Sequence, residues 1–200
     1  VRDVGQAWTD EYGFPKAHMR SLAVGGLARE DVRQVLLAAG PVAAAFSGDD
    51  ALLDKVVAVT SPLGTVAGAD PLYVTCLADD IEAGQVTAGN IAQQPVRLEE
   101  YLQRWWGAIV AQAGQDNATL DLLGTLAAQL GPIRREELIS IHASLKPSWT
   151  GDPIDKALGN LRRTVAGTAQ TGYSFAHPRF RDYVRRYPEV RTYEATLLAY

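Results

Sequence analysis

The sequence has very few of the residues that build disulfides and metal sites. Cys76 is the only cysteine among 200 residues, so no disulfide can form within the chain, and we expect a reducing, cytoplasmic location. The three histidines of the sequence, His18, His142 and His177, are widely spaced and give no metal-binding cluster. No apolar run reaches the length that crosses a bilayer, and no signal-peptide pattern is present, so we expect no membrane partner.

Catalytic motifs are also missing. No glycine is followed after four residues by Gly-Lys-Ser or Gly-Lys-Thr, so the chain lacks a phosphate loop, and we expect no catalysis by it alone. The Gly-x-Ser-x-Gly motif of a nucleophile elbow is absent, although a serine or cysteine triad of another form stays open. Residues 72–80 end in Asp79 and Asp80, like a Walker B strand. Their helical periodicity, with Pro71 in front, favours a helix instead.

The overall composition is that of a globular protein, with 47% hydrophobic and 21% charged residues. A net charge of −4 gives no general attraction to nucleic acid or to anionic lipid. The chain begins with Val1 and not with methionine, and it reads as a piece of a longer protein.

Apolar residues at helical spacing predict a mainly α protein in two parts. In the first part they form three stripes: Val32, Val35, Leu36 and Ala39; Leu53, Val56 and Val57; Leu72, Tyr73, Cys76, Leu77 and Ile81. Asp70 is expected to cap the third helix, with Pro71 at its first position and Gly84 at its end. Residues 85–95 are mostly polar or small, and we place the boundary there, between residues 92 and 93.

The second part reads as helices followed by a hairpin. The predicted helices carry Leu98, Tyr101, Leu102, Trp105, Trp106, Ile109 and Val110; Leu123, Leu126, Ala127 and Leu130; Leu138, Ile141, His142 and Leu145; and Ile154, Ala157, Leu158, Leu161 and Val165, the last over residues 153–165. The paired tryptophans are expected to face the core or an interface and not a ligand, and His142 is expected to face the core. Residues 165–167 and 172–175 flank a turn and predict a hairpin. Three short helices and a hairpin are the order of a winged helix.

His177 stands between the predicted hairpin and a final helix. Pro178 suits a first helical position, so His177 lies at the helix N-cap. Phe180, Tyr183, Val184 and Tyr187 follow at helical spacing, and Arg181 and Arg185 are expected to face away. Two interpretations stay open, because the histidine either simply caps the helix or binds an anion where backbone donors gather.

Two classes of function without a bound small ligand fit the second part of the chain. The second part carries Arg162, Arg163, Arg179, Arg181, Arg185 and Arg186, which would suit a DNA-binding winged-helix regulator. The helix at 153–165, in the position of a recognition helix, begins beside Asp152 and carries Asp155, so a solvated face is favoured and no nucleic-acid partner is expected. The other class is a helical interaction module without a ligand.

Four stretches resemble, in order, parts of the signal-transducing NTPases with numerous domains, the STAND class. Residues 27–32 resemble the step from strand to helix that enters the helical lid. Residues 68–73, Gly-Ala-Asp-Pro-Leu-Tyr, are similar to the Gly-x-Pro lid motif with one extra residue. Residues 98–106 resemble the aromatic helix that enters the winged-helix domain, and residues 173–183 resemble the end of that domain. Together the stretches cover nearly the whole chain.

This resemblance implies a mainly α fold in which a helical lid precedes a winged helix with a short β-hairpin. Residues 1–92 would hold the end of the NTPase core and the lid, residues 93–190 the winged helix, and residues 191–200 the start of a linker to a following domain. The nucleotide-binding core, with its phosphate loop and Mg²⁺ site, would lie upstream. This chain alone would then bind ATP or ADP weakly or not at all.

In the full-length parent, an ATPase switch, the resemblance implies that Pro71 packs on the adenine of ADP or ATP. It also implies that His177 contacts the β-phosphate and that Arg2 lies near the γ-phosphate. Its partners would be that core, the sensor repeats of the parent and, on activation, further copies of the protein.

Overall fold

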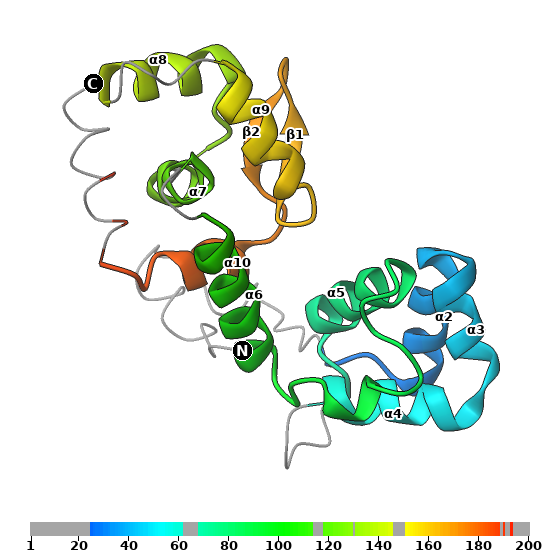
Figure 1. Ribbon diagram of the computed structural model, residues 1–200. Helices are drawn as coiled ribbons and strands as arrows, with labels where there is room; N and C mark the ends of the chain where they lie inside the picture. The colour runs from blue at the N-terminus through cyan, green and yellow to red at the C-terminus, as the bar shows by residue number, and fades with distance from the viewer. Residues whose placement is uncertain are drawn as a thin grey trace, which may run out of the picture. The chain divides into compact units, whose positions relative to one another are not determined.

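The computed structural model describes residues 25–61, 68–113, 118–129, 131–145, 151–188, 190 and 193, except for the side chains of residues 112, 113, 142, 144 and 145. These residues are mainly helical, with one two-stranded antiparallel hairpin, as the sequence predicts (Figure 1). The chain divides into two compact units, Val1–Ile91 and Ala92–Tyr200, one residue before the boundary expected from the sequence. Within the described parts, no helix is long and apolar enough to cross a membrane.

The described residues of the first unit form four helices that pack together: α2 (Arg29–Ala39), α3 (Pro41–Gly48), α4 (Asp50–Thr60) and α5 (Pro71–Glu82). Its core is formed by Val32, Leu36, Ala43, Phe46, Leu53, Val56, Tyr73, Val74, Leu77 and Ile81, which are all 6% exposed or less. The apolar stripes found in the sequence therefore supply most of this core. Helix α3 was not predicted, because its short, alanine-rich sequence shows no clear stripe.

Glu82, at the end of α5, caps the start of α3. Its Oε2 accepts hydrogen bonds from the N–H groups of Val42 at 2.9 Å and Ala43 at 3.0 Å. Gly40 precedes α3 with φ of +148°, and a Cβ there would lie 2.3 Å from the Glu82 carboxyl carbon. Glycine at position 40 thus permits both the backbone conformation and the approach of the carboxylate.

Replacing Glu82 by alanine should lower the free energy of unfolding of the first unit by about 1–2 kcal/mol, because two N–H groups of α3 lose their acceptor and the favourable charge at the helix start is removed. Urea denaturation followed by circular dichroism measures the change. Glu100→Ala, an exposed residue in the first turn of α6, is the control and should change stability by less than about 0.5 kcal/mol. Equal stability of Glu82→Ala and wild type would contradict the cap.

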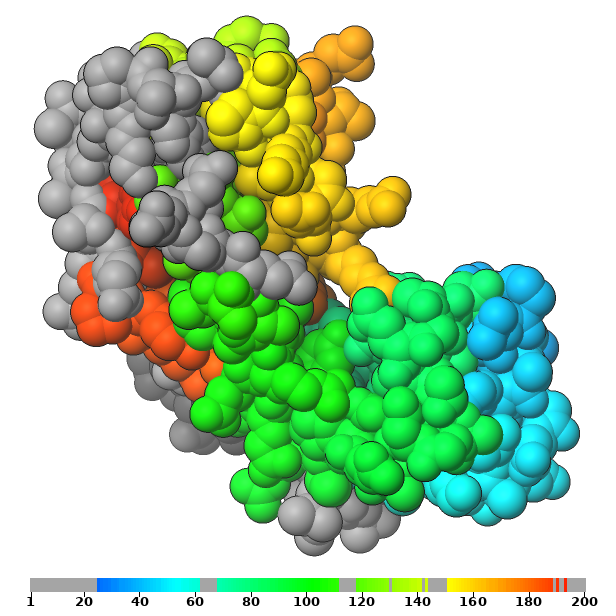
Figure 2. Space-filling view, in the orientation of Figure 1, coloured from blue at the N-terminus to red at the C-terminus, as the bar shows by residue number. Residues whose placement is uncertain are grey.

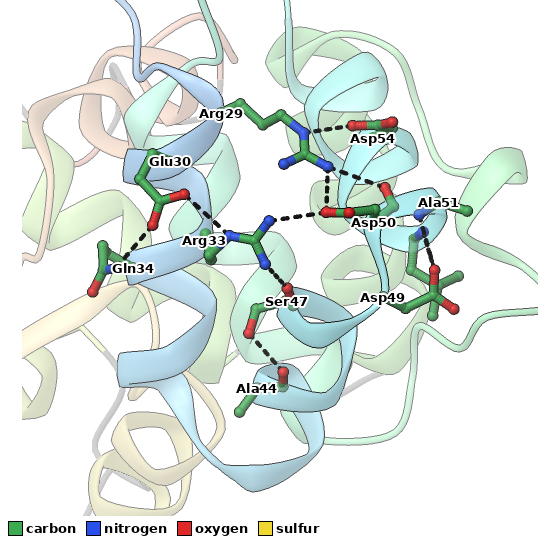
Figure 3. Close-up of polar contacts among 11 residues, drawn as sticks. Arg29, Glu30, Arg33, Gln34, Ala44, Ser47, Asp49, Asp50, Ala51 and Asp54 are labelled. Atoms are coloured by element: carbon green, nitrogen blue, oxygen red, sulfur yellow. Dashed lines mark hydrogen bonds and ion pairs between the residues drawn. The ribbon is translucent and has the colours of Figure 1, made fainter.

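Two arginines of α2 join it to the start of α4 (Figure 3). Arg29 contacts Asp50 at 2.7 Å and Asp54 at 2.6 Å, and Arg33 contacts Asp50 at 3.0 Å. Arg33 also donates to the backbone oxygen of Ser47 near the end of α3. Hydrogen bonds from Arg29, the larger cause, and from Arg33 lower the pKa of Asp50 from its ordinary 3.8. In turn, hydrogen bonds to Asp50 and Asp54 raise the pKa of Arg29.

This network gives a pH dependence with a defined sign. Because the pKa of Asp50 is lower in the folded protein than its ordinary 3.8, the stabilisation is present above pH 3.8 and is lost as the pH falls through the folded value. Melting temperatures measured between about pH 2 and pH 7 should therefore fall less steeply on the acid side for Asp50→Asn than for wild type. If the melting temperatures of the two proteins fell equally steeply at acid pH, the network would not couple proton binding to folding.

The second unit contains α6 (Leu98–Ala113), α7 (Ala118–Ala128), α8 (Arg135–Leu145), α9 (Gly151–Asn160), β1 (Val165–Thr168), β2 (Gly172–Phe175) and α10 (Pro178–Val184). A short 3₁₀ helix, η2 (Ile91–Gln93), lies at the division between the units. Figure 1 shows α7 end-on, with the other elements of this unit around it. Its core includes Leu122, Leu123, Leu126, Ile133, Leu138, Ile154, Leu161, Val165 and Val184.

Helix α9 ends earlier than the sequence predicts, whereas the hairpin begins at Val165 as expected. The predicted helix over residues 153–165 is wrong at both ends, because α9 begins at Gly151 and ends at Asn160. The Thr164 hydroxyl donates to the Leu161 carbonyl at 3.1 Å, closing a turn, and Val165 then pairs with Phe175 in the β-ladder. The tip of the hairpin is exposed and projects from the second unit (Figure 2).

Four aromatic side chains, which we call the aromatic seam, join α6 to α10 and the residues after it: Trp105, Trp106, Phe180 and Tyr187. Trp106 stacks on Tyr187 with ring centroids 4.5 Å apart, and Trp105 contacts Phe180 at 5.4 Å. Both tryptophans pack against the hydrophobic core, which confirms the structural role expected for them. Burial, together with a 3.1 Å hydrogen bond to the Tyr187 hydroxyl, raises the pKa of Tyr183 to about 12.

Arg181 does not face away from the core, so that prediction was wrong. Its Nε donates to the carbonyl oxygen of Ala127 at 3.1 Å, at the end of α7 where backbone carbonyls lack helical partners. Its Nη2 is buried without a hydrogen-bond partner among the described residues. Arg185 is exposed, as its spacing predicts.

Candidate functional site

His177 is held by the elements on both sides of it. The N–H of Ala176 donates to Thr164 O at 2.9 Å, at the base of the hairpin, and Pro178 begins α10 on the other side. The backbone of His177 is extended, with φ −146° and ψ 139°, and its Nδ1 accepts a hydrogen bond from the N–H of Arg179 at 3.2 Å. His177 is therefore the N-cap of α10.

This capping bond constrains the chemistry of the imidazole. A nitrogen that accepts a hydrogen bond carries no proton, so the neutral ring holds its proton on Nε2. No partner of Nε2 lies among the described residues, and the side chain is half-buried. His177 can therefore cap the helix with one nitrogen and donate to an acceptor, such as a phosphate oxygen, with the other.

Pro71 lies at the first position of α5, in a turn held from two sides. Leu27 and Ala69 exchange backbone hydrogen bonds of 2.7 and 2.9 Å, and the N–H of Asp70 donates to Thr60 O at 2.8 Å. The Asp70 carboxylate accepts from the N–H groups at the start of α5, as the sequence predicts. Pro71 is exposed, so an apolar ring is presented on a fixed segment of backbone.

Gly68 has a physical reason to be glycine in this turn. Its φ is +78°, and a Cβ would lie 2.6 Å from the backbone oxygen of Leu27. A side chain at position 68 would therefore disturb the pairing between Leu27 and Ala69 that holds the turn. The glycine of the sequence motif and Pro71 thus belong to one structural element.

Two other residues that the sequence singled out have side chains outside the described part of the structure. Arg2 lies outside the described residues, and so does the side chain of His142, although its backbone is in α8. Pro71 belongs to the first unit and His177 to the second, and each is described within its own unit. In the described parts of the chain, no group of three or more His, Cys, Asp or Glu side chains is placed to hold a metal ion.

Sequence reasoning missed Arg181, which ties α10 to the end of α7. Its spacing of four residues from Arg185 suggested a common solvent-facing side. The signal that could have found it is its place one position beyond the buried Phe180, at the edge of the apolar face of α10.

Comparison with models of protein families, with curated proteins and with solved structures finds no match to this chain.

Proposed function

We propose that this chain is the regulatory portion of a STAND-class signalling NTPase, in which a helical lid and a winged-helix domain close over bound ADP or ATP. The observation that carries the proposal is the placement of His177 between the hairpin and α10, with Nδ1 bound to the Arg179 N–H. This arrangement leaves an Nε2 donor that fits a phosphate oxygen. It also gives one residue two separable functions, capping and ligand binding.

The order of elements supports the winged-helix part of this proposal. Helices α7, α8 and α9 are followed by the β1–β2 hairpin, and α10 comes after it. Ile133, before α8, also exchanges backbone hydrogen bonds of 3.0 and 2.7 Å with Tyr173 of β2. The hairpin is thereby attached to the helices as a wing would be.

In the proposed switch, Pro71 packs against the adenine and the Nε2 of His177 donates to the β-phosphate. The exposed Pro71 ring fits an aromatic base, and Arg2 is assigned to the vicinity of the γ-phosphate. A nucleotide-binding core in the same protein would supply the phosphate loop and Mg²⁺. ADP would favour the closed state, and exchange for ATP would shift the population towards an open state that forms homo-oligomers.

The experiment is to purify the full-length protein that contains this chain and to measure binding and release of a fluorescent ADP analogue. We expect ADP to bind the full-length protein and to bind this chain alone weakly or not at all, because the backbone cradle for phosphate is missing from it. Size-exclusion chromatography with ADP and with ATP then tests oligomerisation. Absence of nucleotide binding by the full-length protein would exclude the proposal.

The alternative, a DNA-binding winged helix, predicts a different result. Asp155, on α9, is bound to Arg135 at 2.6 Å, so this ion pair places a carboxylate on the candidate recognition helix and neutralises a nearby arginine. We therefore expect no tight, sequence-dependent binding of duplex DNA, measured by fluorescence anisotropy at about 150 mM salt. Tight binding that discriminates between sequences would make the DNA-binding function the better one.

A further inference from the structure

Helix α3, all of whose residues the structure describes, presents only apolar residues to the solvent. Its exposed residues are Pro41, Val42, Ala45 and Gly48, and Val42 is 46% exposed. Its only polar side chain, that of Ser47, is 2% exposed and donates to the Ala44 carbonyl at 2.7 Å. A helix on the surface of a globular protein normally carries polar residues on its outer face, whereas a helix that is apolar all round is covered on every side. The outer face of α3 is therefore that of a helix with a partner.

The apolar surface extends onto the last turn of α2, which packs against α3. Leu37 is 49% exposed, and Ala38 beside it is exposed as well. Residues 35–48 include no charged residue, and every exposed residue in this range is apolar. Single exposed apolar residues are common on protein surfaces, but adjoining ones mark a contact surface. We call Leu37, Ala38, Pro41, Val42 and Ala45 the α3 patch.

Carboxylates lie at both ends of α3. At its start, Glu82 accepts hydrogen bonds from the N–H groups of Val42 and Ala43. At its end comes Asp49, which is exposed and whose carboxylate caps α4. Residues 25–91 as a whole contain nine Asp and Glu residues against three Arg and Lys residues. The α3 patch is thus an apolar surface in an acidic unit.

We propose that the α3 patch binds a basic amphipathic helix of a partner protein. The apolar stripe of that helix covers Leu37 and Val42, and its lysines or arginines lie towards Glu82 and Asp49. Amphipathic helices bind apolar surfaces through residues spaced by three and four, and opposite charges around the contact fix their orientation. This inference does not depend on the proposed nucleotide switch.

Charge disfavours two other occupants of an apolar helix face. A second copy that laid its own α3 on the patch, in either direction, would bring the carboxylates of Glu82 and Asp49 in one copy towards those in the other, and like charges repel. A membrane with anionic lipids would repel a unit in which acidic residues outnumber basic ones by nine to three. With a basic partner, the same carboxylates make favourable contacts.

The test uses the whole chain and a fluorescein-labelled peptide of leucine and lysine, LKKLLKLLKKLLKL, which has one apolar and one basic face as a helix. Fluorescence anisotropy at about 50 mM salt should show binding that weakens as salt is added. Val42→Gln should weaken binding by about fivefold or more, because it places a polar group in the apolar contact. The matched control is Val110→Gln, at a valine of α6 that is 47% exposed, and it should change the affinity by less than about twofold.

A second pair of variants tests the contribution of charge. Asp49→Asn retains a good N-cap residue for α4 but removes the carboxylate, and it should weaken binding by about twofold or more at low salt. Glu100→Gln, in the first turn of α6, makes the same change in net charge and should have a smaller effect.

The proposal is overturned if the peptide does not bind, or if wild type and Val42→Gln bind it equally, because the contact would then not involve the patch. A dimer in sedimentation velocity that Val42→Gln dissociates would make a second copy the occupant. Cosedimentation of the chain with phosphatidylglycerol vesicles that Val42→Gln abolishes would make the occupant a membrane. Either of these two results would overturn the proposal as well.

Discussion

Replacing Trp106 by alanine is expected to lower the free energy of unfolding of the second unit by about 2–4 kcal/mol. The indole stacks on Tyr187 and packs against the hydrophobic core, so its removal takes away buried apolar area and an aromatic pair at once. Because the side chain is only half-buried, the effect should lie towards the lower part of the range for fully buried aromatic residues.

Urea denaturation followed by circular dichroism at 222 nm measures this loss without relying on tryptophan fluorescence. Trp106→Phe keeps an aromatic ring against Tyr187 and should lose roughly half as much stability or less. Val110→Ala, at a residue of α6 that is 47% exposed, is the matched control and should change stability by less than about 0.5 kcal/mol. A change at Trp106 as small as that at Val110 would mean that the seam between α6 and α10 contributes little to folding.

Periodicity predicted the parts of the fold in which local sequence and burial agree. Asp70 and Pro71 begin α5, and the hairpin strands lie where Val165 and Tyr173 were expected. Local sequence did not predict the ends of elements that are determined by tertiary contacts. Helix α9 ends at Asn160 because the next residues form a turn and then enter the β-ladder, which periodicity does not reveal.

For the candidate site, sequence placed His177 at a helix start but left its side-chain partners open. The structure adds that Nδ1 is bound to the Arg179 N–H, a fact that depends on the ring orientation and not on residue spacing. Arg181 was misplaced for a related reason. A long side chain at the edge of an apolar face can turn inwards when a helix end, here that of α7, offers an unpaired carbonyl.

The second large effect concerns His177 in the full-length protein that contains this chain. If Nε2 donates to the β-phosphate, loss of a hydrogen bond to a charged group removes about 1.5–3 kcal/mol from the closed state. That corresponds to release of ADP about tenfold faster or more. His177→Asn is the informative variant, because asparagine is among the best N-cap residues and retains the cap of α10 while removing the imidazole.

His177→Ala removes both functions together. It should accelerate ADP release to a similar extent and, in addition, lower the stability of the second unit by about 1 kcal/mol through loss of the cap. The pair of variants therefore separates the structural function of His177 from its proposed function in binding phosphate.

The most direct test of the proposed switch is the rate of ADP release from the full-length protein, measured by stopped-flow with a fluorescent analogue for wild type and His177→Asn. The proposal predicts that His177→Asn releases ADP about tenfold faster or more, with a melting temperature close to that of wild type. Equal release rates for the two proteins, together with a lower melting temperature for His177→Ala, would show that His177 only caps α10 and would contradict the proposal.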